Sequence, residues 1–419
     1  MPCPSETERH GPENGFGAAA ATLGAVNPAR PRLLVLLPSA DGYGSDRALV
    51  AALPRLARDL EPVLVSAADG PTLDAARALG FECHVTPDFA LRRRALRPAA
   101  VPATTLRVAR SLATIRSMHR RRPFDLVYVN TVALALLPGL RAALGGREAP
   151  PIVVHVREVP RTSGRLNLVH FGVISRLAAR VVANSTSTAG FVRDLVPALD
   201  DRLVVVHDGV DDPGEIALVA PGASRRLRIT CVGRIHPQKG QGVLIEALRR
   251  GAAAGHDWEV HLWGDALPEH AALEAELHDA VRSGGLEDRV VWHGYSADTN
   301  AMYAGADVAV VPSTWPEGFS LVCAEAQLHG LPTVATGPGG PSDILDDGVT
   351  GRIVGFDDPD ALVTAFVELE DPQRRAAWGV AARRRALERF TTERYAERLT
   401  AELEELVTSS PAVPAVAAG

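Results

Sequence analysis

Short, continuously apolar runs alternate along the chain with longer segments that have helix-like spacing of Ala, Leu and Arg. Segments 46–60 and 132–144 are examples of the helical kind. Because the apolar runs do not alternate strictly with polar residues, they predict strands that are buried on both faces of a parallel sheet. The first series of predicted strands covers residues 33–37, 62–65, 125–129, 152–156, 181–183 and 203–206.

The pattern stops at 208–224, a stretch that contains many Asp, Gly and Pro residues, and a second strand–helix series follows it. Two such series predict an α/β fold with two doubly wound, Rossmann-like domains that face a central cleft at the carboxyl ends of their strands. The second series of predicted strands covers residues 228–232, 259–263, 289–292, 308–311, 333–335 and 352–354.

These breaks in the pattern also predict the domain boundaries. The expected parts are a disordered tail at 1–30, an N-terminal domain at 31–207, a linker at 208–224, a C-terminal domain at 225–385, a helix crossing back to the N-terminal domain at 386–408, and a disordered tail at 409–419.

Composition narrows the class of protein. The 419 residues carry a net charge of −6 and are 46% hydrophobic, which is typical of a soluble globular protein. No apolar stretch approaches the roughly 20 residues of a membrane-spanning helix, and the start of the chain lacks the features of a secretory signal. The four cysteines are scattered, which argues against a disulfide framework or a cysteine-based zinc site. We therefore expect a cytoplasmic protein.

The single lysine among the 44 basic residues, Lys239, lies in the turn VGRIHPQKG between a predicted strand and a predicted helix. Gly233 and Arg234 follow the strand, and Lys239 opens the next helix. Backbone N–H groups and the positive end of the helix dipole favour a phosphate at such a turn, and two cations make a diphosphate site plausible. The alternative is that Arg234 and Lys239 cap a surface turn.

A second motif, PEGFSLVCAEA, places two carboxylates eight residues apart. Glu317 follows a strand, Gly318, Phe319 and Ser320 form a turn, and Glu325 lies inside the next helix. The spacing suits the two ends of a nucleotide sugar, with one carboxylate on sugar hydroxyls and the other on the ribose diol. Alternatively, Glu317 is a solvated loop charge and Glu325 a surface helix residue.

A third loop, ATGPGGPSDIL, follows the strand predicted at 333–335. Gly339 and Gly340 permit a close approach of the backbone to a ligand, and Asp343 lies where a short helix begins. Such a loop is common by itself. The two motifs described above also follow predicted strands of this sheet. Together the three loops would therefore give three phosphate-binding loops at one edge of the sheet.

This ordered set of motifs, on a two-domain α/β chain, resembles glycosyltransferase family 4 over about residues 32–405. The resemblance implies a retaining enzyme with the GT-B fold that uses a nucleotide-activated sugar. Asp343 stands where many members have Glu, and HDGVDD at Asp208 stands where many have Asn-Gly-Val-Asp. The resemblance gives Glu317 and His155 catalytic roles. It implies donor contacts by Gly42, Gly44, Gly233, Arg234, Lys239, Gly318, Phe319, Ser320, Leu321, Glu325, Gly339 and Gly340.

The N-terminal half offers a glycine loop and polar groups at strand ends. Gly42 and Gly44 lie in the first strand–helix loop, but G-x-G-x-x-Arg lacks the third glycine of a dinucleotide fingerprint. His155 is either a satisfied core histidine or, as the resemblance implies, a contact to the transferred sugar. Predicted acceptor-side residues are Arg47, Asn130, Arg157 and Glu158.

A basic segment lies between Asp88 and Asp125, which enclose ten arginines and no acidic residue. Over 107–122 most arginines lie opposite an apolar helix face. One interpretation is a helix that packs on the core and exposes a solvated basic face. The other, which we state as a hypothesis, is peripheral contact of Arg92 to Arg122 with anionic lipid at the inner face of the plasma membrane.

Together these features predict a metal-independent, retaining glycosyltransferase without a separate cofactor. We expect transfer from a UDP- or GDP-linked sugar to a hydroxyl of a cell-envelope or exopolysaccharide glycan or a lipid-linked acceptor. Arg234, Lys239 and helix N-termini would neutralise the leaving diphosphate. The alternatives are a nucleotide-sugar epimerase of the same fold and a non-catalytic glycan-binding subunit of a synthesis complex. Nucleic-acid binding is not expected, because the net charge is negative and no recognition motif is present.

Overall fold

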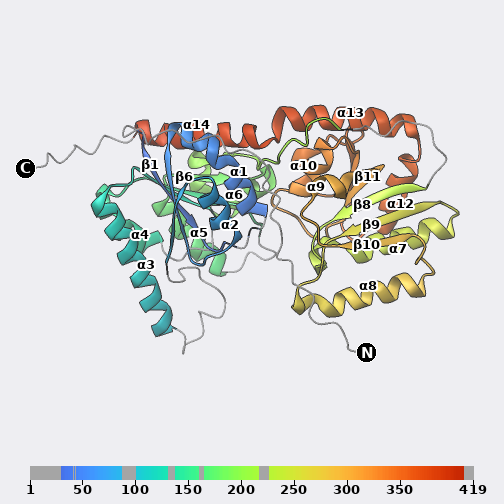
Figure 1. Ribbon diagram of the computed structural model, residues 1–419, viewed down its shortest axis with the longest axis horizontal. Helices are drawn as coiled ribbons and strands as arrows, with labels where there is room; N and C mark the ends of the chain where they lie inside the picture. Colours follow the sequence, from blue (N-terminus) through green and yellow to red (C-terminus); the bar gives the residue numbers. More distant parts are fainter. Residues whose placement is uncertain are drawn as a thin grey trace, which may run out of the picture.

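The computed structural model has two parallel sheets, one in each of two domains that lie side by side (Figure 1). It describes residues 30–40, 42, 44–86, 101–130, 137–159, 165–216 and 226–409. Apart from Arg30 and Ser409, the tails predicted at 1–30 and 409–419 lie outside the described residues, as does 217–224 of the predicted linker. Within these ranges no helix is long and apolar enough to cross a membrane.

The N-terminal domain has a seven-stranded sheet of order β3-β2-β1-β4-β5-β6-β7. Its strands are β1 (Arg32–Leu37), β2 (Glu61–Ser66), β3 (Glu82–Val85), β4 (Leu126–Val129), β5 (Ile152–Val156), β6 (Arg180–Ala183) and β7 (Leu203–Val205). Its helices are α1 (Gly44–Asp59), α2 (Pro71–Ala78), α3 (Val101–Arg121), α4 (Leu137–Ala143), α5 (Arg165–Leu177) and α6 (Thr186–Leu195), with 3-10 turns at Gly146–Glu148 and Pro197–Arg202.

The C-terminal domain has a six-stranded sheet of order β10-β9-β8-β11-β12-β13. Its strands are β8 (Leu227–Val232), β9 (Trp258–Trp263), β10 (Val290–Gly294), β11 (Val308–Val311), β12 (Thr333–Thr336) and β13 (Gly351–Val354). Its helices are α7 (Gln241–Ala253), α8 (Ala271–Ser283), α9 (Thr299–Tyr303), α10 (Leu321–Leu328), α11 (Pro341–Ile344), α12 (Pro359–Glu368) and α13 (Pro372–Arg389), with 3-10 turns at Pro237–Lys239 and Pro268–His270.

Both faces of the N-terminal sheet are covered, as the continuous apolar runs predict. Along β1, Leu33, Val35 and Leu37 belong to one core cluster, whereas Leu34 and Leu36 belong to the cluster on the opposite face. All five side chains are buried. Helices α1 and α2 contribute to the first cluster and α3 and α5 to the second, so β1 lies inside a three-layer domain. The doubly wound architecture predicted from the sequence is therefore confirmed.

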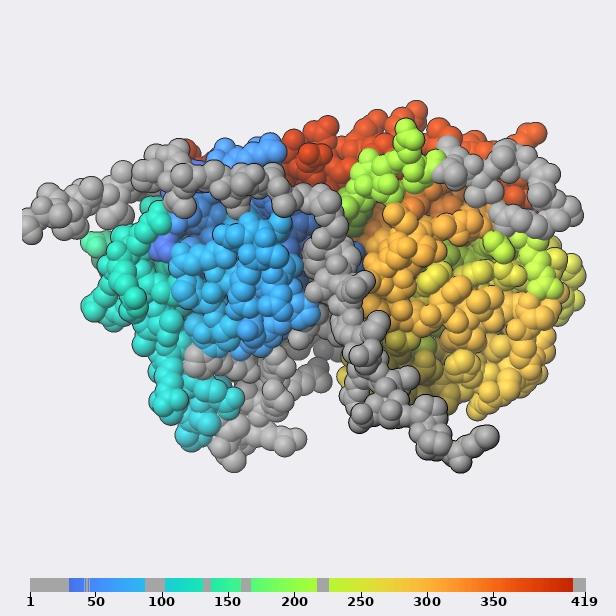
Figure 2. Space-filling model, in the orientation of Figure 1, coloured from blue at the N-terminus to red at the C-terminus, as the bar shows by residue number. Residues whose placement is uncertain are grey.

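Two C-terminal helices join the domains. Helix α13 packs on the C-terminal domain, and α14 (Thr392–Ser409) places Tyr395, Leu399 and Leu403 in the core of the N-terminal domain. Figure 1 shows these helices, in red, along one side of both domains, and in Figure 2 their red surface is visible mainly above the C-terminal domain. The chain thus passes between the domains twice. The two passages pair, because Val210 N donates to Phe390 O and Thr392 N donates to Val210 O, each at 2.9 Å.

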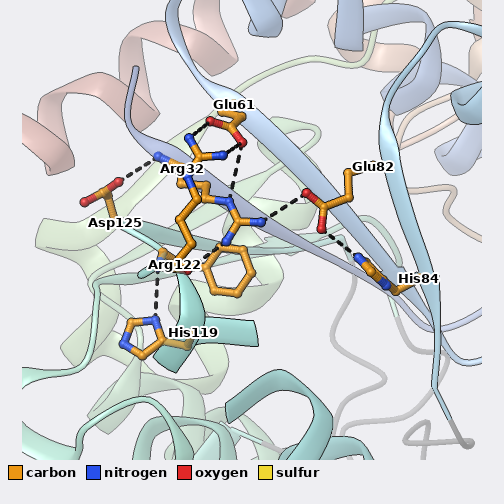
Figure 3. A network of polar contacts seen from close by, with 8 residues as sticks. Arg32, Glu61, Glu82, His84, His119, Arg122 and Asp125 are labelled. Atoms are coloured by element: carbon orange, nitrogen blue, oxygen red, sulfur yellow. Dashed lines mark hydrogen bonds and ion pairs between the residues drawn. The ribbon is translucent and has the colours of Figure 1, made fainter. Parts of the chain in front are cut away.

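A polar network at the amino ends of the N-terminal strands fixes the carboxyl end of α3 (Figure 3). The Arg32 side chain donates to Arg122 O at 2.7 Å and to Glu82 at 3.1 Å, and its guanidinium lies 4.7 Å from the centre of the Phe124 ring. Arg122 in turn pairs with Glu61. The amino-terminal end of α3 extends away from the sheet (Figure 1), so the helix is held at one end. The residues labelled in Figure 3 are Arg32, Glu61, Glu82, His84, His119, Arg122 and Asp125.

Candidate functional site

Lys239 and Glu317, which belong to different motifs, form a direct ion pair. Lys239 Nζ lies 2.5 Å from Glu317 Oε1. The sequence predicts that Lys239 opens a helix, and this is wrong. The residue ends the 3-10 turn Pro237–Lys239, and α7 begins two residues later. His236 is the N-cap of this turn, and its Nδ1 accepts a hydrogen bond from Gln238 N at 3.0 Å. The lysine stem lies over Gly233.

Glu317 is a buried carboxylate, with a relative exposure of 7%. Ser313 Oγ donates to its Oε1 at 2.7 Å, beside the Lys239 ammonium. Burial acts to raise the pKa of Glu317, but the charge and hydrogen bond of Lys239 and the hydroxyl donors outweigh it and hold the pKa below its usual value. At neutral pH, Glu317 is therefore a buried carboxylate whose negative charge is balanced by Lys239. It is not a solvated loop charge. Ser313 carries no motif signal, and the sequence did not reveal it.

Glu325 lies inside α10 with 12% of its side chain exposed. Tyr303 donates its hydroxyl to Glu325 Oε2 at 3.0 Å, and Arg47 Nη2 from the N-terminal domain lies 3.9 Å from Oε1. Burial raises the pKa of Glu325, against the lowering effects of Arg47 and Tyr303. The interpretation as an ordinary surface residue is excluded. Arg47, expected on the acceptor side, lies against the carboxylate expected to bind the nucleotide.

The turn before α10 contacts the glycine loop of the other domain. Ser320 caps α10, with its Oγ accepting from Cys323 N at 3.4 Å, and Phe319 packs beside His207 and Phe390. A Cβ at Gly44 would lie 2.6 Å from Leu321 Cδ1. Gly42 has a φ of 74° and donates its N–H to Thr72 Oγ1 at 3.0 Å. The first loop of the N-terminal domain therefore reaches the C-terminal motif.

The third loop packs on the second. Gly340 N donates to Glu317 O at 2.9 Å, and a side chain at Gly340 would overlap Gly318 O. A Cβ at Gly339 would lie 3.3 Å from Glu317 N, which is a tight contact without overlap. The contact between the two loops therefore requires a glycine at position 340, whatever ligand the loops also hold. The three C-terminal motifs, which also include exposed Arg234, lie together at the carboxyl ends of the adjacent strands β8, β11 and β12.

The predicted site residues at the carboxyl ends of β4 and β5, both catalytic and acceptor-side, are mostly buried. His155 has no exposed surface, and its Nδ1 lies 2.5 Å from the Tyr128 hydroxyl. Burial, followed by the charge of Arg157, lowers the pKa of His155 well below the usual value, so the ring is neutral. The structure thus places His155 inside the domain. Its predicted contact with the transferred sugar stays a prediction.

Arg157 is also buried and fully engaged. It forms an ion pair with Asp208 and donates to Asn130 Oδ1 at 3.1 Å and to the Tyr395 hydroxyl at 2.7 Å. Arg157 and Asn130 therefore join a strand end to the first interdomain passage and to α14, and their predicted place on the acceptor side stays a prediction. Glu158 is exposed.

Within the described ranges, no group of three or more His, Cys, Asp or Glu side chains is placed to hold a metal ion. The requirement for a metal or a separate cofactor stays a prediction.

Comparison with known proteins identifies the class. The family described as Glycosyltransferase Family 4 matches residues 38–212, and Glycosyl transferases group 1 matches residues 226–371. The lipopolysaccharide core biosynthesis mannosyltransferase LpsB of Rhizobium meliloti is 32% identical over 246 residues, which span 56% of this chain and 68% of LpsB. A D-inositol 3-phosphate glycosyltransferase of Salinispora tropica is 35% identical over 231 residues, which cover 50% of this chain and 47% of that protein.

A solved structure covers more of the chain. Anabaena HepE in complex with UDP-glucose superposes with a TM-score of 0.73 and 26% identity, covering 89% of this chain and 99% of HepE. The chain belongs to glycosyltransferase family 4. The predicted GT-B fold and glycosyltransferase activity are therefore confirmed.

Proposed function

We propose that the protein is a retaining glycosyltransferase that moves a sugar from a nucleoside-diphosphate sugar to a hydroxyl of a cell-envelope glycan of the lipopolysaccharide-core type. The arrangement of Lys239 beside Glu317, with Glu325 on the helix that follows, carries the proposal. It offers a cation for a diphosphate and separate carboxylates for sugar and ribose hydroxyls. The similarity to LpsB, a lipopolysaccharide core mannosyltransferase, supports the acceptor class, and that to HepE with UDP-glucose supports the donor class.

The environment of Glu317 supports transfer without a protein nucleophile. Its Oε1 accepts from both Lys239 and Ser313, so the carboxylate is already stabilised and weakly nucleophilic. In the same-face mechanism of retaining enzymes, the departing phosphate oxygen takes the proton of the acceptor hydroxyl. Lys239 and exposed Arg234 would stabilise the diphosphate in a preorganised site, which is usually the largest contribution to such catalysis.

Glu325→Ala is expected to weaken donor binding by about 10- to 100-fold. The substitution removes the carboxylate that is expected to accept hydrogen bonds from the ribose hydroxyls. Thermal shift and calorimetry with UDP-, GDP- and ADP-sugars measure the loss and identify the base. Glu368→Ala is the matched control, since Glu368 pairs with Arg352 and Arg374 elsewhere in the same domain. Unchanged donor-induced stabilisation in Glu325→Ala would remove this residue from the nucleotide site. Turnover of donor without acceptor would favour the epimerase alternative.

We further propose that α3 contacts an anionic membrane surface electrostatically. Ile115 and Met118 are buried in the core, so the apolar face of α3 is not available for insertion into lipid. The opposite face exposes Arg110, Arg116 and Arg120, and no carboxylate among the described residues pairs with them. Leu106, near the free end, is 52% exposed. The arginines of the basic segment before residue 101 lie outside the described residues.

Replacing Arg110, Arg116 and Arg120 with Gln is expected to reduce vesicle binding by about 100-fold, at about 1 kcal/mol for each basic residue near the surface. The measurement is co-flotation with vesicles that contain anionic lipid, at low and high salt. Replacing Arg249, Arg282 and Arg394 with Gln changes the net charge equally at exposed sites elsewhere and is expected to leave binding intact. Equal binding of both variants, or equal binding to neutral vesicles, would contradict the proposal.

A further inference from the structure

The side chain of Asp343 crosses from the C-terminal domain to the N-terminal domain. Asp343 belongs to α11, directly after the glycine loop, and only 7% of its side chain is exposed. Its Oδ2 accepts from Thr186 N at 2.6 Å and from His207 Nε2 at 2.9 Å, and its Oδ1 accepts from the Thr186 hydroxyl. Thr186 begins α6, and His207 lies where the chain leaves the N-terminal domain. One carboxylate therefore joins three donors of the other domain.

The chemistry of this contact favours a charged acceptor. The first N–H groups of a helix have no partner within it, and the helix dipole makes them positive. Ser185, the capping residue of α6, accepts from Thr188 N, so the N–H of Thr186 is left for Asp343. Burial acts to raise the pKa of Asp343, but the hydrogen bonds from His207 and Thr186 hold it below the usual value. The carboxylate is ionised at neutral pH, which strengthens the contact.

Asp343 is also linked to the loops of the site. Gly340, three residues earlier, donates its N–H to Glu317 O at 2.9 Å. His207 packs its ring 5.9 Å from the ring of Phe319, which is in the turn between Glu317 and Glu325. Arg385 of α13 donates to the carbonyl oxygens of Asp343 and Ile344 at 3.1 and 2.7 Å. A shift of Asp343 relative to α6 would therefore shift the backbone around Glu317.

We propose that Asp343 is a positioning residue, which holds the donor-binding loops of the C-terminal domain in register with the acceptor-binding N-terminal domain. This inference rests on the proposed function. The residue acts through Thr186 and His207 and does not need to touch the donor. Its loss would affect the alignment of donor and acceptor more than the affinity for the donor, since a displacement of about 1 Å can reduce a reaction rate by about 100-fold.

Asp343→Ala is expected to lower kcat at least about tenfold, the effect of one charge-assisted hydrogen bond, while the donor Kd changes by less than about twofold. Thr186→Val, which removes the hydroxyl and keeps the backbone N–H, should show a smaller loss of kcat, and its effect should not add to that of Asp343→Ala. The matched control is Asp347→Ala. Asp347 lies four residues on, and its side chain contacts Arg352 and Ile353 N, both in the C-terminal domain.

A second measurement does not depend on the reaction. Spin labels on α2 and α8 report the distance between the domains in the ligand-free protein, and Asp343→Ala should broaden its distribution while Asp347→Ala should not. An unchanged distribution, a normal kcat, or a parallel loss of donor affinity and kcat in Asp343→Ala would each overturn the inference. If the wild-type protein binds no nucleotide sugar, the proposed function fails, and the distance measurement still decides whether Asp343 fixes the domains.

Discussion

Lys239→Ala is expected to reduce sugar transfer by about 100- to 1000-fold, the usual effect of removing one preorganised donor at a site of developing negative charge. In this protein the loss has a second component. Lys239 neutralises Glu317, so the variant leaves a buried carboxylate without its cation, which is strongly destabilising at about 3 to 5 kcal/mol for a fully buried pair. Because 30% of the Lys239 side chain is exposed, we expect a smaller loss of unfolding free energy than that. Steady-state kinetics and thermal unfolding measure the two effects separately.

The double variant Lys239→Ala with Glu317→Gln distinguishes these effects. Without the buried charge, it should unfold close to the wild-type temperature and remain inactive. The pKa of Glu317 is lower in the folded state than in the unfolded state, so the pair stabilises the fold above the unfolded pKa, and this contribution is lost as the pH falls through the folded value. The destabilisation of Lys239→Ala should therefore shrink below about pH 4. Substantial transfer by Lys239→Ala would refute the assignment.

Lys239→Arg preserves the charge and is nevertheless expected to impair transfer. The Lys239 ammonium lies 2.5 Å from Glu317 Oε1, and the stem of the lysine lies over Gly233. A planar guanidinium has a different shape from this compact ammonium and does not replace it. The single lysine is thus retained at a position where arginine, the basic residue used elsewhere in the chain, has the wrong shape.

The sheets were predictable wherever strands are buried on both faces. The runs at β1 and β11 are apolar throughout, the run at β5 is interrupted by His155, and the predicted ends of all three agree with the structure within one residue. Strand β3 was not predicted, because Glu82–Val85 is an edge strand with half-exposed, polar positions. Its sequence ECHV has no apolar run. Pairing with β2, which depends on residues about 20 positions away, makes it a strand.

The C-terminal site was predictable from motifs because each motif is tied to a strand end. The motifs did not show in which direction a side chain points or which residue it contacts. His155, near the carboxyl end of β5, is fully buried, and its Nδ1 lies 2.5 Å from the Tyr128 hydroxyl. The Arg157 guanidinium is used by Asp208 and by Tyr395, 238 residues away. Asp343, expected in a phosphate-binding loop, instead binds Thr186 of the other domain. These contacts depend on how the two domains meet, which local sequence patterns do not record.

Gly318 and Arg157 bring the backbones of the two domains into close contact beside Glu317. Gly318 lies in the turn after Glu317, and a Cβ at this position would overlap the carbonyl oxygen of Arg157 in the N-terminal domain. That oxygen has little freedom to move. It accepts from Asn184 Nδ2 at 3.2 Å, and the Arg157 side chain is fixed by Asp208 and Tyr395. The added methyl group must therefore push the domains apart or displace the turn that carries Glu317.

Gly318→Ala is accordingly expected to reduce transfer by about 100-fold or more, as a displacement of about 1 Å between reacting groups can do. The C-terminal domain should remain folded, because the conflict lies between the domains and not within its core. Gly190→Ala is the control: Gly190 is inside α6, a Cβ there meets nothing within 4 Å, and alanine should stabilise the helix by about 0.5 to 1 kcal/mol. The measurements are kcat at saturating donor and thermal unfolding of both variants. A displacement of this kind is expected to reduce the rate by about 100-fold. If Gly318→Ala retains more than about a tenth of the wild-type rate, close contact between this turn and Arg157 is not needed for the reaction.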